Sequence, residues 1–370
     1  MAVITADVDL ARAVHAPPGP VSTAVPIEVR PFEAADAAQW TAYLDRHSAS
    51  TLFHGLEWKR AVERTFGHRF RGFTASRGDQ LVGVLPLYEV RSLFAGKLLV
   101  SVPYATYGGI LADDAAVVDR LYAAARTLQQ SIGARSLEFR SIRAEVPDLA
   151  ARVTHATFVR SLPETPEAID AMLPRKARAA ARRAVERGGL SVEFDPGRME
   201  VLWQLYARSM RRLASPNYPL RFFREIAGAL PDRHIVQIVR HNGVAVAGLF
   251  SFIWRDRVIP YFVGIDERVE VYGLSHYLYS ESMKHAVAIG CRVYDFGRSR
   301  IDNRGPFEFK RLCGFEPTEL QYQVAVADGR AAPDLSPTSP RWSAARRAWR
   351  TLPLAITRPL GGWLAKSIPG

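Results

Sequence analysis

The residue types best suited to chemistry gather late in the chain, in residues 290–317 (GCRVYDFGRSRIDNRGPFEFKRLCGFEP). A predicted strand over 292–296 carries Asp295 near its end and leads into a polar loop with Arg298 and Arg304. Cations beside the carboxyl end of a strand meet free backbone groups where a ligand can enter. The pattern predicts a corner that handles an anion. The alternative is an ordinary strand, loop and helix with solvated arginines.

A weaker copy of this pattern occurs earlier. Residues 133–139 (GARSLEF) align with 290–296 (GCRVYDF), and a helical pattern precedes the glycine in both. Upstream, 79–85 (DQLVGVL) resembles 243–249 (GVAVAGL), so the copies lie about 160 residues apart. Repeats of this length indicate a duplicated domain and not a solenoid.

The order of predicted elements in the second half is typical of a mixed, acyltransferase-type sheet. It reads strand, two helices, three strands, helix, strand, helix and strand, and the first half is a looser version. We therefore expect an α/β (α+β) fold. We expect a disordered N-terminal extension (1–26), a first domain (27–167) and a second, catalytic domain (168–330). A Pro/Ser linker (331–340) and a basic amphipathic tail (341–370) follow.

Charge and cysteine content limit the classes of function. Most of the net charge of +12 lies in the runs 175–187 and 331–370, which indicates two local patches and not a generally basic surface. Cys291 and Cys313 lack metal-ligand spacing and are expected in the core, so no metal site or disulfide framework is predicted. With no recognisable secretion signal and no bilayer-length apolar run, we expect a cytoplasmic protein.

The tail has the composition of a membrane-surface helix. Trp342, Ala345, Trp349 and Leu352 fall on one helical face, with arginines elsewhere. Basic amphipathic helices of this kind lie in the interface of anionic membranes. We expect peripheral association with the inner membrane through this tail. The alternative is a helix docked on the protein's own surface.

These motifs together resemble the FemAB/FemX-like peptidyltransferase superfamily. The cluster FEFKRLCGF, at 307–315, is similar to the Phe-Lys signature of this superfamily. The basic helix that begins with PRKAR, at 174–178, is similar to the helix ahead of the superfamily's second domain. SVPYATYGG, RSMRRLASPNYPLRFF, YDFGRS and FKRLCGFEP most resemble the FemAB-related proteins associated with exosortase (PEP-CTERM) and exopolysaccharide systems. The resemblance covers 27–365 and implies two tandem GNAT-like acyltransferase domains with mixed central sheets.

Two departures from the family bear on the donor. Residues 199–230 predict two ordinary helices in place of the coiled-coil arm, which weighs against transfer RNA as a partner. Residues 268–275 hold one glycine where coenzyme A-dependent relatives have a glycine-rich turn, although a phosphate can still meet the helix N-terminus at Ser275. No tightly bound cofactor is implied, and both aminoacyl-tRNA and acyl-CoA stay open as the activated donor.

The resemblance assigns the electrostatic role to Lys310, whose cation would meet a donor phosphate or the developing oxyanion. Asp295 is a candidate to orient the nucleophile or accept its proton, or else to tie down a neighbouring arginine. Arg298 and Arg304 are candidates for binding an anion, and His276 is either a base or structural. The sequence shows no Ser-His-Asp or Cys-His pattern, which favours direct transfer in a ternary complex.

Two further segments are candidates for binding substrate. The loop over 104–109 predicts an acceptor site, since aromatic rings stack on sugars and glycines permit close approach; the alternative is a tight turn. The basic helix from 175 can bind the phosphate of a lipid-linked or nucleotide donor, or present a solvated face. The residues proposed for substrate binding are Tyr104, Tyr107, Gly108, Gly109, Phe309, Arg304, Arg175 and Lys176.

The expected function is that of an acyl- or aminoacyltransferase modifying a cell-envelope or exopolysaccharide precursor at the inner membrane surface. Two alternatives stay open. One is a CoA-dependent N-acyltransferase of a small substrate. The other is a non-catalytic, membrane-associated partner of a polysaccharide or protein export system. Two local basic patches are modest support for transfer RNA as a partner.

Overall fold

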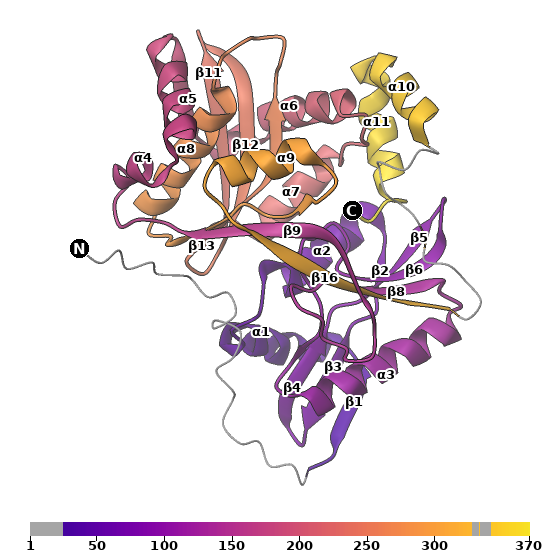
Figure 1. The fold of residues 1–370 in the computed structure, drawn as a ribbon. Helices are drawn as coiled ribbons and strands as arrows, with labels where there is room; N and C mark the ends of the chain where they lie inside the picture. The colour runs from indigo at the N-terminus through magenta and orange to yellow at the C-terminus, as the bar shows by residue number, and fades with distance from the viewer. Residues whose placement is uncertain (1–24, 328–332, 334–341) are drawn as a thin grey trace. The chain divides into compact units, whose positions relative to one another are not determined.

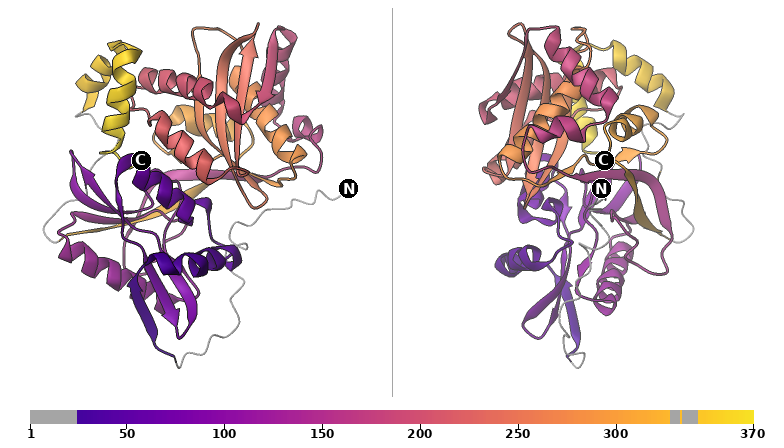
Figure 2. Two further views of the ribbon diagram at one scale, coloured as in Figure 1. Left: turned by 180° about the vertical axis from the view of Figure 1, so that it is seen from behind. Right: turned by 60° about the vertical axis from the view of Figure 1, so that its left-hand side comes forward.

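The computed structural model describes residues 25–327, 333 and 342–370. Contacts divide the chain into two compact units. The first unit runs to Val153 and also includes Leu320–Pro333 and Pro369–Gly370. The second unit comprises Thr154–Glu319 and the C-terminal helices as far as Ile368. Figure 1 shows the ribbon coloured along the chain, and Figure 2 shows it from two further sides.

The first unit combines strands with amphipathic helices. Its elements are β1 (Ile27–Pro31), α1 (Ala37–Arg46), α2 (Leu56–Phe66), β2 (Arg69–Phe70), β3 (Phe73–Arg77), β4 (Gln80–Leu85), β5 (Tyr88–Ser92), β6 (Gly96–Ser101), β7 (Leu111–Ala112), α3 (Ala115–Ser131), β8 (Ser136–Phe139) and the later part of β16 (Pro317–Val326). The strands run in the orders β1-β3-β4-β7 and β16-β8-β6-β5-β2. Val117 and Leu121 of α3 are fully buried in the same core as Val82 of β4 and Leu137 of β8.

The second unit repeats this plan at larger scale. Its elements are β9 (Ala151–Ser161), α4 (Ala168–Met172), α5 (Arg175–Glu186), β10 (Leu190–Phe194), α6 (Met199–Arg212), α7 (Leu220–Ala229), β11 (His234–His241), β12 (Val244–Trp254), β13 (Arg257–Ile265), α8 (Leu274–Ala288), β14 (Val293–Asp295), β15 (Ser299–Arg300), α9 (Arg304–Leu312), α10 (Ser343–Thr351) and α11 (Leu354–Ala365). Its strand order is β10-β11-β12-β13-β14-β9, with β15 pairing to β9. The β13–β14 pair is parallel, while β10 to β13 are antiparallel neighbours.

Local sequence explains how the central hairpin and the covering helices form. Asn242 and Gly243 both have positive φ (50° and 79°), as a two-residue type I′ turn between β11 and β12 requires. Gly264 lets α6 lie directly on β13, because a Cβ there would stand 2.2 Å from the backbone nitrogen of Tyr206. The sheet therefore has little freedom to shift beneath α6.

The expected fold is confirmed, with differences in the boundaries. Both units contain mixed sheets, and between β10 and β11 the described chain forms α6 and α7, with no long helical arm. The expected boundary at 167/168 differs from the contact boundary after Val153, because β9 pairs with β14 of the second unit. The expected end of the second domain at 330 differs too, since β16 pairs with β8 of the first unit. Residues 1–24 of the expected extension and most of the linker at 331–340 lie outside the described residues.

The chain between β9 and β10 forms two helices, α4 and α5, and not one. The chain leaves α4 at Leu173 and Pro174, and α5 begins at Arg175. A proline has no N–H to donate to the preceding turn and fits just before a helix, so it separates α4 from α5. Ala177, Ala180, Ala181 and Ala184 form the buried face of α5, which packs on α8.

The C-terminal tail is docked on the second unit. Both α10 and α11 pack against α6. Arg211 donates to the carbonyl oxygen of Arg350 at 3.0 Å, and Asn217 donates to that of Arg358 at 3.2 Å. On this face the tail is therefore docked on the protein's own surface, as the alternative interpretation predicted. Among the described residues, no helix is both long and apolar enough to cross a bilayer.

Candidate active site

The candidate site lies where two parallel strands of the second unit end their pairing. β13 and β14 are in register at Arg257–Val293 and Val258–Tyr294. β14 ends at Asp295, and Gly297, with φ of 66°, turns the chain. β13 continues beyond these pairs and leads to α8, whose first turn has backbone N–H groups without intrahelical partners. Such a junction of strand ends and a helix N-terminus suits an anionic group.

Lys310 of α9 points into this corner and not to open water. Its Nζ donates to the carbonyl oxygens of Gly297 at 2.9 Å and Arg298 at 3.0 Å. The ring centroids of Phe158 and Phe296 lie 5.3 and 5.4 Å from the ammonium. Burial lowers the pKa of Lys310 to about 7, although the charge of Asp295 acts to raise it. Carbonyl oxygens of described residues accept hydrogen bonds from two of the three N–H groups of the Lys310 ammonium, so the third N–H can donate to an incoming oxygen.

The Asp295 carboxylate faces inward and shapes the corner. Asp295 is 0% exposed and accepts a hydrogen bond from the N–H of Gly297 at 3.0 Å. Its Oδ2 lies 3.3 Å from Nη1 of Arg257. This geometry favours the interpretation of Asp295 as an acid that ties down an arginine. This ion pair brings in Arg257 from β13, a residue that the sequence pattern did not indicate.

Phe309 forms one side of an aromatic cluster next to Lys310. Its ring centroid lies 5.0 Å from that of His276, 5.6 Å from that of Tyr279 and 6.3 Å from that of Phe296. Burial lowers the pKa of His276, which favours its neutral form. His276 is in the first turn of α8, so α8 and α9 together place an imidazole and an aromatic ring beside the corner.

The remaining cations predicted for the second unit are more exposed. Arg298 is half-buried in the loop after β14, and Arg304 is exposed at the first position of α9. Arg175 and Lys176 are exposed in the first turn of α5, on the side away from its alanine face. The structure thus brings Lys310, Asp295, Arg298 and Phe309 together in one corner. It leaves Arg304 and the basic face of α5 open to solvent.

The predicted acceptor loop lies in the first unit with its tyrosines inward. Tyr104 and Tyr107 are 2% and 4% exposed. The Tyr104 ring stacks on Phe66 at 4.1 Å, and its hydroxyl hydrogen-bonds Nε2 of His68 at 2.7 Å. These ring faces are used in packing, which favours the tight-turn interpretation over stacking on a sugar.

The glycines of the same loop are packed closely as well. Gly108 has a φ of 148°, and a Cβ there would lie 2.6 Å from a Val102 methyl. A Cβ on Gly109 would meet the Glu145 carboxylate at 2.3 Å. Glu145 accepts a hydrogen bond from the N–H of Ile110 at 2.6 Å. Burial raises the pKa of this carboxyl to about 8. Both glycines therefore have a packing role that the tight-turn interpretation predicts.

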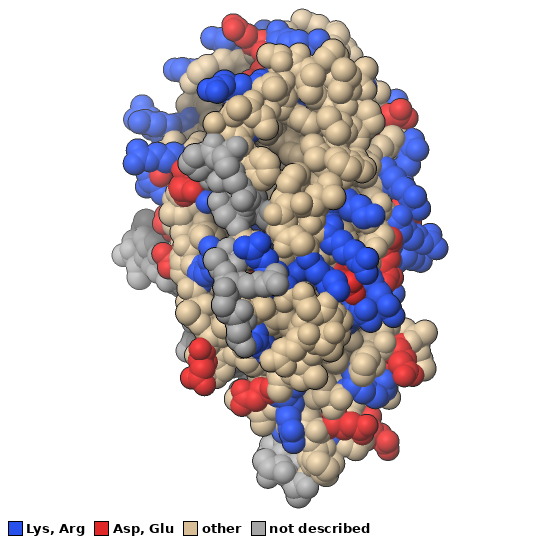
Figure 3. Space-filling view, turned by 90° about the vertical axis from the view of Figure 1, so that its right-hand side faces the viewer, with Lys and Arg blue, Asp and Glu red and all other residues tan. Residues whose placement is uncertain are grey.

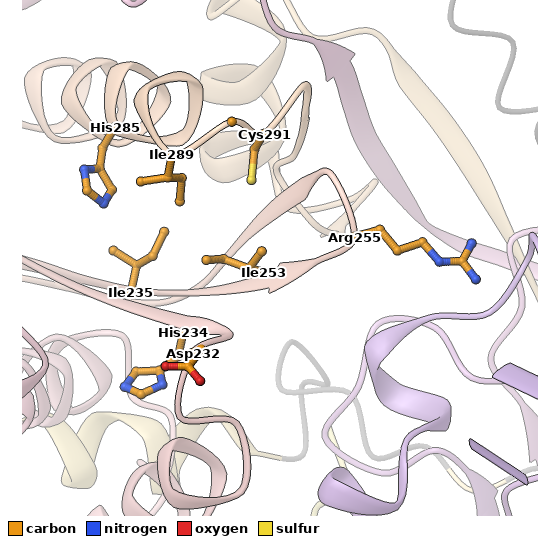
Figure 4. A pocket seen from close by; sticks show the side chains of 9 residues that line it. Asp232, His234, Ile235, Ile253, Arg255, His285, Ile289 and Cys291 are labelled. Carbon is orange, nitrogen blue, oxygen red and sulfur yellow. The ribbon is translucent and has the colours of Figure 1, made fainter. Parts of the chain in front are cut away.

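A cavity of about 460 Å³ lies elsewhere in the second unit. Figure 4 shows the side chains around it, with Arg255 directed away from the others. It contains none of the predicted site residues, and His285 and Ile289 place it at the opposite end of α8 from His276. Among the described residues no cluster of His, Cys, Asp and Glu is suited to a metal ion. The chemistry of the corner, and not the size of this cavity, identifies the candidate site.

Sequence reasoning missed three participants. Arg257 begins β13 and pairs with Asp295, Phe158 comes from β9, and Tyr279 is one turn along α8 from His276. None has a local motif, because each reaches the corner from a distant strand or helix. The strand pattern that follows Arg257 in the sequence was the one available signal.

Comparisons with known proteins place this geometry in a known fold. A family model described as an acetyltransferase (GNAT) domain matches residues 173–311. No curated protein matches the sequence. The structure is similar to a crystal structure of FemX, with a TM-score of 0.59 and 12% identity over 81% of this chain and 98% of that one. It is also similar to a tandem GNAT protein from the clavulanic acid biosynthesis pathway, with a TM-score of 0.53 and 12% identity over 83% and 100%.

A third similar structure is the C-terminal domain (DUF2156) assigned to a lysylphosphatidylglycerol synthetase from Agrobacterium fabrum. Its TM-score is 0.52, with 15% identity over 80% of this chain and 93% of that one. At these identities the three structures show a shared tandem GNAT fold. The match to residues 173–311 spans α5 to α9, including Lys310 and Asp295. The second unit thus carries a GNAT acyltransferase domain, and the protein is an acyltransferase.

Proposed function

We propose that this acyltransferase moves an acyl or aminoacyl group onto a cell-envelope or exopolysaccharide precursor, by direct transfer in a ternary complex. The observation that carries the proposal is the ammonium of Lys310, fixed between two backbone carbonyls, with a third N–H for which the described part of the chain supplies no acceptor. A preorganised cation of this kind stabilises an oxyanion as it develops. Lys310 and Arg298 are then the catalytic and anion-binding groups, and Asp295 is a positioning residue.

The state of the cysteines supports direct transfer. Burial raises the pKa of Cys313 to about 12, and burial also raises the pKa of Cys291. The thiolate is the nucleophilic form of cysteine, so neither side chain suits a covalent acyl intermediate. An amine or hydroxyl of the acceptor would therefore attack the donor carbonyl itself, and His276 or water would take the proton.

The donor can be aminoacyl-tRNA or acyl-CoA, with no tightly bound cofactor. FemX and the lysylphosphatidylglycerol synthetase domain share the fold, and we propose an envelope acceptor for this chain by analogy with them. The motifs shared with FemAB-related proteins lead us to propose a place in an exosortase-associated exopolysaccharide system. The exposed basic face of α5, with Arg175 and Lys176, would bind the phosphates of the donor or of the precursor.

A second candidate is a CoA-dependent N-acyltransferase of a small substrate. The acetyltransferase family match and the uncapped N-terminus of α8 favour it. Calorimetry with acyl-CoA and with aminoacyl-tRNA separates the two, since micromolar binding of acyl-CoA alone favours the second candidate. Mass spectrometry of envelope glycans from cells with and without the protein tests the first. An added acyl or aminoacyl mass that depends on the protein supports it, and identical glycans contradict it.

A further inference from the structure

The C-terminal helices keep an apolar stripe on the side that is not docked. α11 buries Thr357, Gly361 and Ala365, which are spaced four residues apart. Ile356 and Trp363 are seven residues apart on a different face and are 47% and 57% exposed. Residues at i and i+7 lie on one side of a helix, so both side chains extend from the same face.

The charge on the same segment has one sign. Residues 342–370 contain five basic residues, Arg346, Arg347, Arg350, Arg358 and Lys366, and no acidic residue. Arg347, Arg350 and Lys366 are exposed. Figure 3 shows the side of the molecule that carries these helices in Figure 1, and Lys and Arg side chains border uncharged surface in its upper half.

The docking contacts hold this surface in place. Trp349 of α10 is 9% exposed, and Arg350 donates from Nε to the carbonyl oxygen of Arg212 at 3.2 Å. The guanidinium of Arg358 lies 5.4 Å from the Trp203 ring centroid. Leu213, at the end of α6 next to Arg212, is 49% exposed. The segment thus presents apolar side chains from a fixed base and does not need to unfold to use them.

We propose that the exposed face of α10 and α11 binds an anionic bilayer, with Trp363 and Ile356 inserted at headgroup depth and Arg346, Arg347 and Lys366 over the lipid phosphates. Tryptophan with a basic surround is the composition of interfacial helices. Each Lys or Arg near an anionic membrane surface strengthens binding by about fivefold. This surface differs from the membrane helix expected from the sequence, because the face with Trp349 is used for docking and the opposite face for lipid.

Co-sedimentation of the full chain tests the proposal, with vesicles of phosphatidylcholine alone and with equal parts of phosphatidylglycerol. Binding to the anionic vesicles is expected to fall with salt, because charged contacts are screened. Arg346→Gln with Arg347→Gln should weaken it roughly tenfold or more. Arg120→Gln with Arg143→Gln, which removes the same charge from exposed sites of the first unit, should leave it unchanged.

The apolar contribution has its own matched pair of variants. Trp363→Ser should weaken anionic-vesicle binding roughly tenfold. Val244→Ser, at a position 62% exposed in the β11–β12 hairpin, should not change it. Equal loss in test and control variants, or no vesicle binding by the wild type, would overturn the proposal. So would a dimer in lipid-free solution that Trp363→Ser abolishes, since a second copy would then cover the face. No donor or acceptor enters this assay, so its result is independent of acyl transfer.

Discussion

The Nζ of Lys310 lies 2.9 Å from the carbonyl oxygen of Gly297, so helix α9 is fastened to the turn that follows β14. This bond links a residue of the aromatic and basic cluster to the glycine of the Asp-Phe-Gly corner. It makes the position of the ammonium depend on the shape of the turn, and the shape of the turn depend on the ammonium. Transition-state stabilisation by a cation needs such fixed geometry.

The pH dependence of acyl transfer should report the protonation of Lys310. Burial lowers its pKa to about 7, and the protonated ammonium is the form that binds an oxyanion. We therefore predict that kcat/KM falls as pH rises through about 7. Lys310→Arg, which keeps its charge throughout this range, should lose that fall even if its activity is lower. A wild-type rate that climbs steadily through the same range would contradict the assignment.

Asp295 should matter for stability before it matters for chemistry. Asp295→Asn removes the charge that faces Arg257 and weakens the acceptor for the Gly297 N–H. We predict a loss of about 2 kcal/mol in the free energy of unfolding, measured by urea denaturation. Arg257 is partly exposed, so Arg257→Gln should cost less. Asp295→Asn with unchanged stability and no activity would instead assign it a proton-transfer role.

Gly273 should be more sensitive to substitution than Gly188, another glycine of the second unit with positive φ. A Cβ on Gly273 (φ 81°) would stand 2.1 Å from the carbonyl oxygen of Ala180 on α5, whereas one on Gly188 (φ 78°) meets no atom within 4 Å. Gly188→Ala should cost about 1 kcal/mol for the backbone alone. Gly273→Ala should cost about 3 kcal/mol, because α5 must also move off α8. Equal losses in thermal unfolding would show that α5 is not packed tightly there.

Glu145 should make the first unit less stable as pH rises. Burial raises its folded-state pKa to about 8 from an ordinary value of 4.5. Between these values the folded carboxyl keeps a proton that the unfolded chain releases, so stability falls as pH increases through that window. Glu145→Gln, which stays neutral, should flatten this part of the stability curve. A wild-type curve that rises across the same window would rule out a buried protonated carboxyl.

Repetition and turn chemistry made most of the fold predictable from sequence. The aligned Gly133 and Gly290 patterns predicted two related units, and the dipeptide Asn242-Gly243 is typical of the turn that the central hairpin uses. The pairing of β9 with β14 and of β16 with β8 could not be predicted, because periodicity identifies a strand but not its neighbour. The docking of the tail on α6 depended on contacts such as Asn217 with Arg358, which have no pattern in the sequence.

The site was predictable where its residues adjoin in sequence and not where they come from separate elements. Lys310, Phe309 and Asp295 were predicted together because they lie in one motif-bearing segment, and the structure brings them to one corner. Arg257 was missed because only strand pairing brings it to Asp295. Tyr104 and Tyr107 were proposed to bind substrate because aromatic residues beside glycines are typical of binding loops, whereas both side chains are buried in the first unit.

The most direct test compares envelope glycans from cells that carry Lys310→Met or Arg311→Gln in place of the wild type. Arg311 follows Lys310 on α9 but is 51% exposed and paired with Glu308, so it controls for the loss of one positive charge. Mass spectrometry should show that Lys310→Met slows the modification by roughly 100- to 1,000-fold while Arg311→Gln retains it, at similar unfolding midpoints. Full modification by a folded Lys310→Met variant would contradict the account.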